Sequence, residues 1–215
     1  MTRRKVNQWS SLGLWERWIF ATSIAEIIGL AIVGVVSIII SHFGYIQGAF
    51  TLVGTLEGSI LGFAQWLVIR RHIHHSTRWI IATVIGGLFA WFTGLTVSNV
   101  MAIVYAGVSD ANKILTFFKG LVLLGAFLGT ILGFCQWLVI KNQIRFSMWW
   151  IVANAVAWSA GIFIGYLGAG MVEEDFTLRT ALVTVATGTT MGAVIGGITG
   201  IVLVFLLKSS KKQVR

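Results

Sequence analysis

The sequence lacks proline entirely and has one cysteine and few charged residues. Without proline, the broken helices that form many transporter sites can be built only at glycine, which argues against a transporter without excluding one. The single cysteine, Cys135, cannot form a disulfide within the chain and carries no information about the redox compartment. Charged residues make up 11% of the chain, against about 25% in soluble domains, so an ordinary soluble protein is excluded.

Apolar residues dominate instead, since 57% of the chain is hydrophobic and its mean hydropathy is +0.88. Six apolar runs each reach the roughly 20 residues that cross a hydrocarbon core of about 30 Å. We predict an all-α fold, a polytopic membrane helical bundle of six transmembrane helices arranged as three parallel-repeat hairpins. The transmembrane domain covers residues 17–207, and its hairpins lie at about residues 17–69, 78–140 and 149–207.

The hairpin prediction comes from an internal repeat. The stretches GTLEGSILGFAQWLVIR, from Gly54, and GAFLGTILGFCQWLVIK, from Gly125, are identical at eleven of seventeen positions. A weaker copy, GAVIGGITGIVLVFLLK, begins at Gly192. The helix that precedes each copy opens in a similar way, with RWIFAT, RWIIAT and WWIVAN, so the repeated unit is one helical hairpin. Each unit enters the membrane from the same side, which makes the repeats parallel.

Glycines recur at four-residue steps in these copies and therefore line one stripe of a helix. In an apolar helix such a stripe allows another backbone to approach closely. We expect the stripes to act as glycine zippers that join the helices of each hairpin, and to bind partner transmembrane helices or a second copy of the chain. The helix-packing glycines are Gly54, Gly58, Gly62, Gly125, Gly129, Gly133, Gly188, Gly192, Gly196 and Gly200.

The repeated motif GxxxGxxQWLVI, followed by a basic residue and by a helix that opens with RW or WW, resembles a motif of uncharacterised bacterial multi-pass membrane proteins. The resemblance covers most of residues 17–150. It implies helical hairpins and transfers no activity or site.

The cations indicate the orientation of the chain. Thirteen of the sixteen Lys and Arg residues lie on the side of the predicted bundle that holds both chain ends, and Lys113, Lys119 and Arg179 lie on the other side. By the positive-inside rule both termini are cytoplasmic, and the bacterial inner (plasma) membrane is the expected location. Residues 1–16 then form a cytoplasmic basic and aromatic arm, and residues 208–215 a cytoplasmic basic tail. Anionic lipids of the cytoplasmic face are the expected partners, and nucleic acid is not.

Five polar residues are expected at a common depth, about 6 to 8 Å inside the cytoplasmic boundary. They are Thr22, Gln65, Thr83, Gln136 and Asn154. Hydrogen bonding between helices is the simpler role for this polar layer. The alternative is a polar constriction on a pathway through the bundle.

Two carboxylates, Glu26 and Glu57, are expected near the midplane of the membrane, and no Lys or Arg lies at a comparable depth. An ionised carboxylate without a partner is costly in hydrocarbon, so each is expected to be protonated or to share a proton or a cation. Both are candidates for proton or cation handling, and a protonated, hydrogen-bonding role is the alternative. The second hairpin has Gly87 and Leu128 at the corresponding positions, so the carboxylates belong to the first hairpin alone.

The sequence shows no catalytic or cofactor-binding machinery. Cys135 has no histidine at a matching depth and Ser59 has only a glutamate nearby, so no nucleophile is paired with a base. The histidines of the loop RRHIHHSTR stand among arginines, which oppose a divalent metal ion. The acidic run Glu173, Glu174 and Asp175 is interpreted as a solvated turn. We therefore expect no enzyme activity, no metal and no cofactor.

Two functions follow from these observations. The favoured one is a non-enzymatic accessory or assembly protein whose glycine stripes bind its own or partner helices. The alternative is a small channel or a proton- or cation-coupled transporter that uses Glu26 and Glu57, with the polar layer as its path. The direction of the two glutamates distinguishes the two: a hydrated cavity in front of them favours transport, and a tightly packed helix favours assembly.

Overall fold

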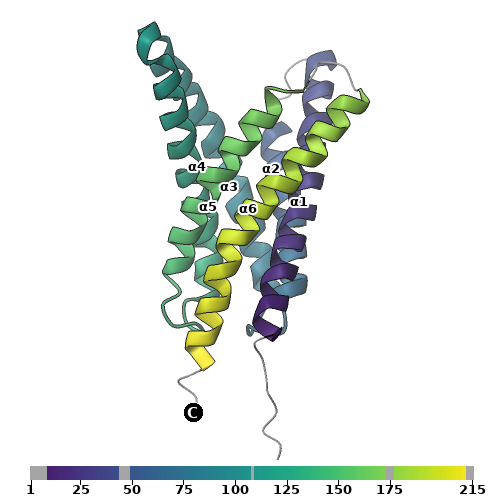
Figure 1. Ribbon diagram of the computed structural model, residues 1–215, viewed down its shortest axis with the longest axis vertical. Coiled ribbons are helices and arrows are strands. Elements are labelled where there is room, and N and C mark those ends of the chain that lie inside the picture. The colour runs from purple at the N-terminus through teal and green to yellow at the C-terminus, as the bar shows by residue number, and fades with distance from the viewer. Residues whose placement is uncertain (1–8, 44–48, 108, 173–176, 212–215) are drawn as a thin grey trace, which may run out of the picture.

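The computed structural model describes residues 9–43, 49–107, 109–172 and 177–211. Over these residues the fold is all-helical, with no strand (Figure 1). The six helices are α1 (Trp9–Phe43), α2 (Ala49–Ile69), α3 (Thr77–Ala106), α4 (Asp110–Ile140), α5 (Trp149–Ala169) and α6 (Leu178–Lys211).

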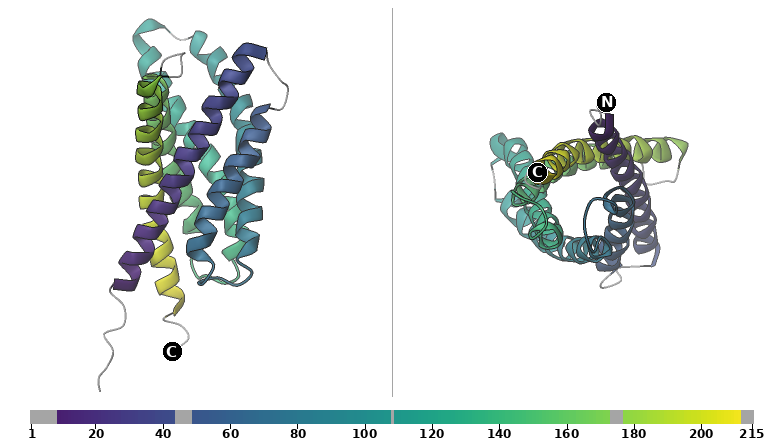
Figure 2. Two further views of the ribbon diagram at one scale, coloured as in Figure 1. Left: turned by 90° about the vertical axis from the view of Figure 1, so that its right-hand side faces the viewer. Right: turned by 90° about the horizontal axis from the view of Figure 1, so that it is seen from below.

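The helices form a closed ring. Each helix packs against the helices before and after it in the chain, and α6 packs against α1. Figure 2 shows this ring from the end at which α1 begins and α6 ends. The loops at residues 70–76 and 141–148 lie at that same end, which we call the terminal end.

The composition of the helices identifies a membrane protein. Five helices are long and apolar enough to cross a membrane, and their apolar segments are Gly13–Ile40, Leu52–Ile69, Asn112–Ile140, Trp149–Ala169 and Leu178–Ser210. The perimeter of the ring is correspondingly apolar, since Phe20 and Leu123 are each 68% exposed. Exposed apolar patches of this extent are stable only against hydrocarbon or a partner. The sixth helix, α3, has 30 residues and lies between α2 and α4.

The helices at the chain ends extend beyond the predicted membrane domain. Helix α1 begins at Trp9, so residues 9–16 of the predicted arm are helical, and α6 runs to Lys211 of the predicted tail. Tertiary contacts explain the longer first helix, because the Trp15 indole Nε1 donates a 3.0 Å hydrogen bond to the carbonyl oxygen of Gly197 on α6. Residues 1–8 and 212–215 lie outside the described part of the chain.

The glycine stripes join different helices from those we predicted. A Cβ placed on Gly58 of α2 would lie 2.8 Å from the carbonyl oxygen of Thr83 on α3. A Cβ on Gly133 of α4 would lie 3.1 Å from the Cα of Ile151 on α5, and the stripe of α6 faces α1 in the same way. The glycines of the three stripes therefore do not join the two helices of each predicted hairpin. They join α2 to α3, α4 to α5 and α6 to α1.

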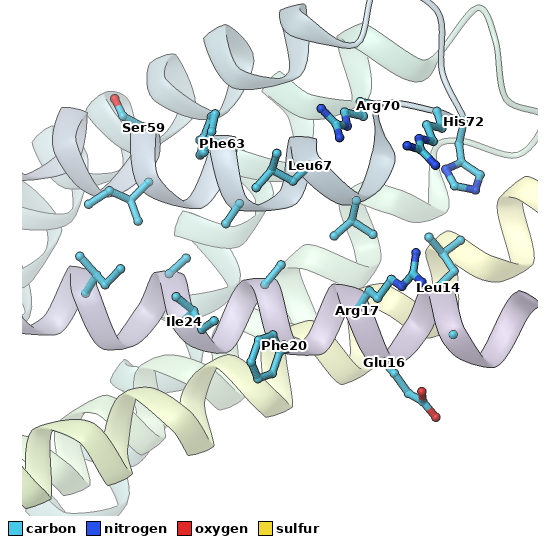
Figure 3. Close-up of a pocket in the computed structure, with 18 residues that line it drawn as sticks. Leu14, Glu16, Arg17, Phe20, Ile24, Ser59, Phe63, Leu67, Arg70 and His72 are labelled. Atoms are coloured by element: carbon cyan, nitrogen blue, oxygen red, sulfur yellow. The ribbon is translucent and has the colours of Figure 1, made fainter.

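A groove of 1410 Å³ runs between α1 and α2 on the perimeter of the ring (Figure 3). No glycine stripe lies between α1 and α2, because the stripe of α2 faces α3. The two helices therefore leave room for a groove.

Candidate functional site

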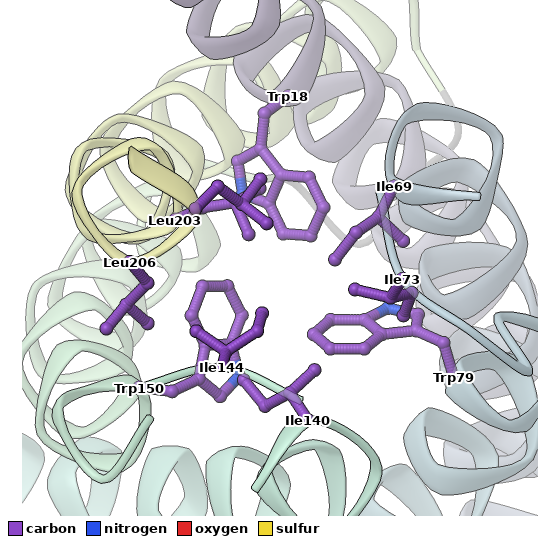
Figure 4. Close-up of a cluster of buried hydrophobic side chains, with 10 residues drawn as sticks. Trp18, Ile69, Ile73, Trp79, Ile140, Ile144, Trp150, Leu203 and Leu206 are labelled. Atoms are coloured by element: carbon purple, nitrogen blue, oxygen red, sulfur yellow. The ribbon is translucent and has the colours of Figure 1, made fainter. Parts of the chain in front are cut away.

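Three tryptophans close the interior of the ring near its terminal end. Trp18, Trp79 and Trp150 are each 0% exposed, and their ring centroids lie 5.5 to 6.0 Å apart in edge-to-face arrangements (Figure 4). Such aromatic pairs add about 0.5–1.5 kcal/mol each to the free energy gained by burying their surface. Apolar side chains from α2, α4, α6 and the two loops complete this tryptophan plug, and they are Ile69, Ile73, Ile140, Ile144, Leu203, Leu206 and Leu207.

Each indole of the plug donates a hydrogen bond to a polar side chain one layer deeper in the ring. Trp79 Nε1 donates to Gln65 Oε1 at 3.2 Å, and Trp150 Nε1 donates to Gln136 Oε1 at 2.9 Å. Trp18 Nε1 donates to Thr199 Oγ1 at 2.9 Å. These bonds satisfy all three buried indole N–H groups and fix the plug to the layer above it.

Thr199 is a member of the polar layer that the sequence analysis missed. We aligned the third copy of the repeat from Gly192, which places Leu203 opposite Gln65. In the structure Gly196 meets Ile19 and Thr22 as Gly62 meets Ile80 and Thr83. The third copy is therefore displaced by four residues, one helical turn, and Thr199 takes the place of the glutamine. The four-residue glycine step of α6 occurs in both alignments, so the glycines alone do not distinguish them.

The polar layer is connected across helices. Gln136 Nε2 donates to Gln65 Oε1 at 3.2 Å and to Thr83 Oγ1 at 3.1 Å, which links α4 to α2 and α3. Asn154 donates instead to the carbonyl oxygen of Trp150 in its own helix. Thr22 is 0% exposed, and its hydroxyl has no hydrogen-bond partner among the described residues. The layer is thus bonded on the side of α2, α3 and α4 and unsatisfied at α1.

Glu26 lies one helical turn deeper than Thr22 on the same face of α1. Its side chain is 1% exposed, and neither carboxyl oxygen has a hydrogen-bond partner in the described part of the chain. Burying an ionised carboxylate without a partner costs several kcal/mol in a protein interior. A hydrogen-bonding role for Glu26 therefore has no partner within the described part of the chain, and a bound proton or cation would neutralise the group.

Glu57 of α2 is held between α1 and α3. Its Oε2 accepts a hydrogen bond from the indole Nε1 of Trp91 on α3. Its Oε1 lies 3.0 Å from the position that a Cβ on Gly29 of α1 would occupy. Gly29 is three residues after Glu26, so the Glu57 carboxyl group meets α1 about one helical turn from the Glu26 backbone.

Neither glutamate lines the groove between α1 and α2. Glu26 is almost fully buried, and Glu57 is half-buried against Gly29 and Trp91. The indole Nε1 of Trp158 is a further buried group without a partner among the described residues. Glu26 is therefore enclosed, which does not fit an open pore.

The other polar candidates stay separate from this site. His74 pairs with Gln143 of the neighbouring loop through the backbone N–H of His74 and the Gln143 Oε1, at 2.7 Å. Cys135 is partly buried on α4 and forms no disulfide. Within the described ranges no three His, Cys, Asp or Glu side chains are close enough to hold a metal ion. Glu173, Glu174 and Asp175 lie outside those ranges.

Comparison with protein-family models, with curated proteins and with solved structures finds no match to this chain.

Proposed function

We propose that this chain is a six-span protein of the bacterial inner membrane, built from three parallel two-helix repeats with both termini in the cytoplasm, that binds and transfers a proton or a small cation. The six-span proposal is supported by the position of α3 inside the same ring as the five apolar helices. The orientation is supported by the cations gathered at the terminal end.

The observation that carries the function is the state of Glu26. Its carboxyl group is 1% exposed, and neither oxygen has a hydrogen-bond partner among the described residues. Ionising such a group without a bound cation costs free energy. Ionisable groups buried in membrane proteins commonly mark proton or ion pathways. Glu57 of α2 meets α1 at Gly29, about one helical turn from Glu26, and supplies a second carboxyl group for the ion.

The packing of Glu57 against α1 and α3 by itself favours assembly. We give more weight to Glu26, because helix packing does not account for two buried carboxyl oxygens without a partner among the described residues. The enclosed position of Glu26 then favours an ion-coupled carrier over an open channel. In this proposal the Glu26 and Glu57 pair is the binding site, and the tryptophan plug is a gate between it and the cytoplasm. The polar layer lies between the two and provides the intermediate contacts. The role is non-enzymatic.

The accessory interpretation has the glycine stripes bind helices of the same chain or of a partner. All three stripes pack against helices of the same chain, so none of them is left for a partner. A partner would have to bind elsewhere on the perimeter.

Ion flux through reconstituted liposomes tests the proposal. The purified protein should carry protons, sodium or potassium faster than empty liposomes, and Glu26→Gln should lower that flux about tenfold or more, since the amide cannot exchange a proton. Glu16→Gln is the matched control, because Glu16 is an exposed glutamate of the same helix. Its flux should equal that of the wild type.

Thermal unfolding in detergent shows whether each variant is folded. Glu26→Gln should keep the melting temperature of the wild type or raise it, because the amide has the same shape and carries no charge. Absence of flux in the wild type, or equal flux in a folded Glu26→Gln variant, would refute ion transfer. The accessory role would then be the better interpretation.

A further inference from the structure

The groove between α1 and α2 has an apolar wall on each side. Phe20, Ile24 and Ile28 line it from α1, and Phe63 and Leu67 line it from α2 (Figure 3). All five are at least 40% exposed, so the groove opens onto the perimeter that faces the membrane. Gly13, Ala21, Ala25 and Ala64 also line it, and these small residues provide its depth.

The end of the groove nearest the terminal end is basic. Arg17 of α1 and Arg70 and Arg71 at the end of α2 line it, together with His72. Figure 3 shows Arg17, Arg70 and His72 gathered at this end, whereas the carboxylate of Glu16 points away from the groove. The guanidinium of Arg70 stacks over the ring of Trp66, 5.3 Å from its centroid, which restrains its orientation.

The length of the apolar part matches one leaflet of a bilayer. From Arg17 to Ile28 the helical rise gives about 16 Å. Half of a hydrocarbon core is about 15 Å. A phospholipid whose phosphate reaches the arginines would therefore lay an acyl chain along the whole groove.

We propose that this groove is a binding site for an anionic phospholipid of the leaflet at the terminal end. The guanidinium groups would bind the phosphate, since arginine presents paired N–H donors that match phosphate oxygens. Basic pockets between transmembrane helices are a recognised form of anionic headgroup site. The apolar walls would bind one acyl chain, which a soluble anion lacks.

A second groove, between α3 and α4, is the natural comparison. It has a volume of 540 Å³ and is lined by Arg78, Ile81 and Leu138 at positions that correspond to Arg17, Phe20 and Leu67 by the internal repeat. Its lining has Asn142 and Gln143 where the first groove has Arg71 and His72. The second groove is thus smaller. It is lined by one arginine with His74 and His75, whereas the first is lined by three arginines with His72 and Glu16, so the second has fewer permanent cations.

A single glycine contributes to the difference in size. A Cβ on Gly86 of α3 would lie 2.9 Å from Leu132 Cδ1 of α4, so the absence of a side chain lets these helices approach closely. The corresponding residue of α1 is Ala25, which lines the first groove. The first groove therefore has both the room and the charge that a lipid requires. Since Ala25 directly precedes Glu26, a bound lipid would also brace the helix that carries the proposed ion site.

Lipid retention measured by native mass spectrometry tests this site. Phosphatidylglycerol or phosphatidylcholine would be added at increasing concentration to the detergent-purified protein. The fraction of protein that retains one lipid would be measured at each concentration. The wild type should bind phosphatidylglycerol about tenfold or more tightly than phosphatidylcholine, and the double variant Arg17→Gln with Arg71→Asn should lose that preference, a change of about 1.4 kcal/mol. Arg78→Gln in the second groove is the matched control and should leave the preference unchanged.

A second variant tests the apolar part without changing any charge. Ala21→Phe should fill the groove and reduce retention of phosphatidylglycerol about tenfold, whereas Ala82→Phe, its counterpart in the second groove, should not. Melting temperatures in detergent would confirm that each variant is folded.

The proposal is overturned if phosphatidylcholine binds as tightly as phosphatidylglycerol, if the Arg17 and Arg71 variant keeps its preference, or if Arg78→Gln removes the preference equally. Displacement of the lipid by millimolar inorganic phosphate would also overturn it, since the site would then bind a free anion. Ion flux is not measured here, so this result stands apart from the test of Glu26.

Discussion

Glu57 Oε1 lies 3.0 Å from the point at which a Cβ on Gly29 would stand, and the other oxygen of the same carboxyl group is bonded to Trp91. The small residue on α1 therefore makes room for the carboxyl group of α2, and the two helices meet through it. This contact connects the two helices that bear Glu26 and Glu57.

Adding a methyl group at Gly29 should displace Glu57. Gly29→Ala is expected to destabilise the protein by about 1–3 kcal/mol, because the carboxyl group must move away from a bonded position in a packed interior. Thermal unfolding in detergent measures this effect. Gly34→Ala is the control on the same helix, because no described atom lies within 4 Å of a Cβ there.

The contact between Gly29 and Glu57 can be isolated by a second substitution. In a Glu57→Ala background the cost of Gly29→Ala should largely disappear, since the clashing group is gone. An equal cost in both backgrounds would mean that the methyl group disturbs something other than Glu57.

The close approach of α2 and α3 predicts a large effect of a small substitution. Gly58→Ala should lower the free energy of unfolding by about 1–3 kcal/mol, because the new Cβ would meet the Thr83 carbonyl oxygen at 2.8 Å. Gly197→Ala is the matched control on α6, since a Cβ there has open space among the described residues. Alanine is the better helix former by about 0.5–1 kcal/mol, so this control should be neutral or stabilising. Equal effects at the two positions would contradict close backbone packing.

The bond between Gln136 and Gln65 predicts coupling between the two residues. Gln136→Leu and Gln65→Leu should each destabilise the protein by about 1–3 kcal/mol, because each leaves a buried indole N–H without its acceptor. The double variant should cost less than the sum of the two, since the Gln136 Nε2 to Gln65 Oε1 bond is lost only once. Melting curves of the four proteins give the coupling. Strict additivity would show that the two amides act independently.

Cysteine labelling tests the six-span topology at α3. In a Cys135→Ala background, the cysteine of His74→Cys should react with a membrane-impermeant thiol reagent added on one side of the membrane. The cysteine of Asn112→Cys should react with reagent added on the other side. Both residues are exposed, and they flank α3. His74→Cys should react from the cytoplasmic side, as the positive-inside rule requires. Reaction of both cysteines from one side would show that α3 does not cross the membrane.

The sequence predicted the position and type of the elements well, because these depend on residues close together in the chain. The apolar runs, the four-residue glycine steps and the polar residues at one depth are all local patterns, and the structure contains a helix at each apolar run. Gln65, Gln136 and Glu26, which the sequence places within apolar helices, are buried in the structure.

The sequence could not predict which helices the stripes meet. A glycine stripe is a flat surface without a marked partner, and the short loop between α1 and α2 suggested the helix of the same hairpin. Only the closed ring, in which α6 packs against α1, assigns each stripe to the next unit.

The sequence by itself therefore determined an all-helical membrane protein with glycine stripes, a polar layer and two acidic residues away from any cation. The tertiary structure decided that Trp18, Trp79 and Trp150 meet, that Thr199 completes the layer, and that Glu26 has no partner among the described residues. The physical reason is that helical periodicity fixes the direction of a side chain relative to its own helix axis. The rotation and separation of helices far apart in the chain depend on how all six pack together.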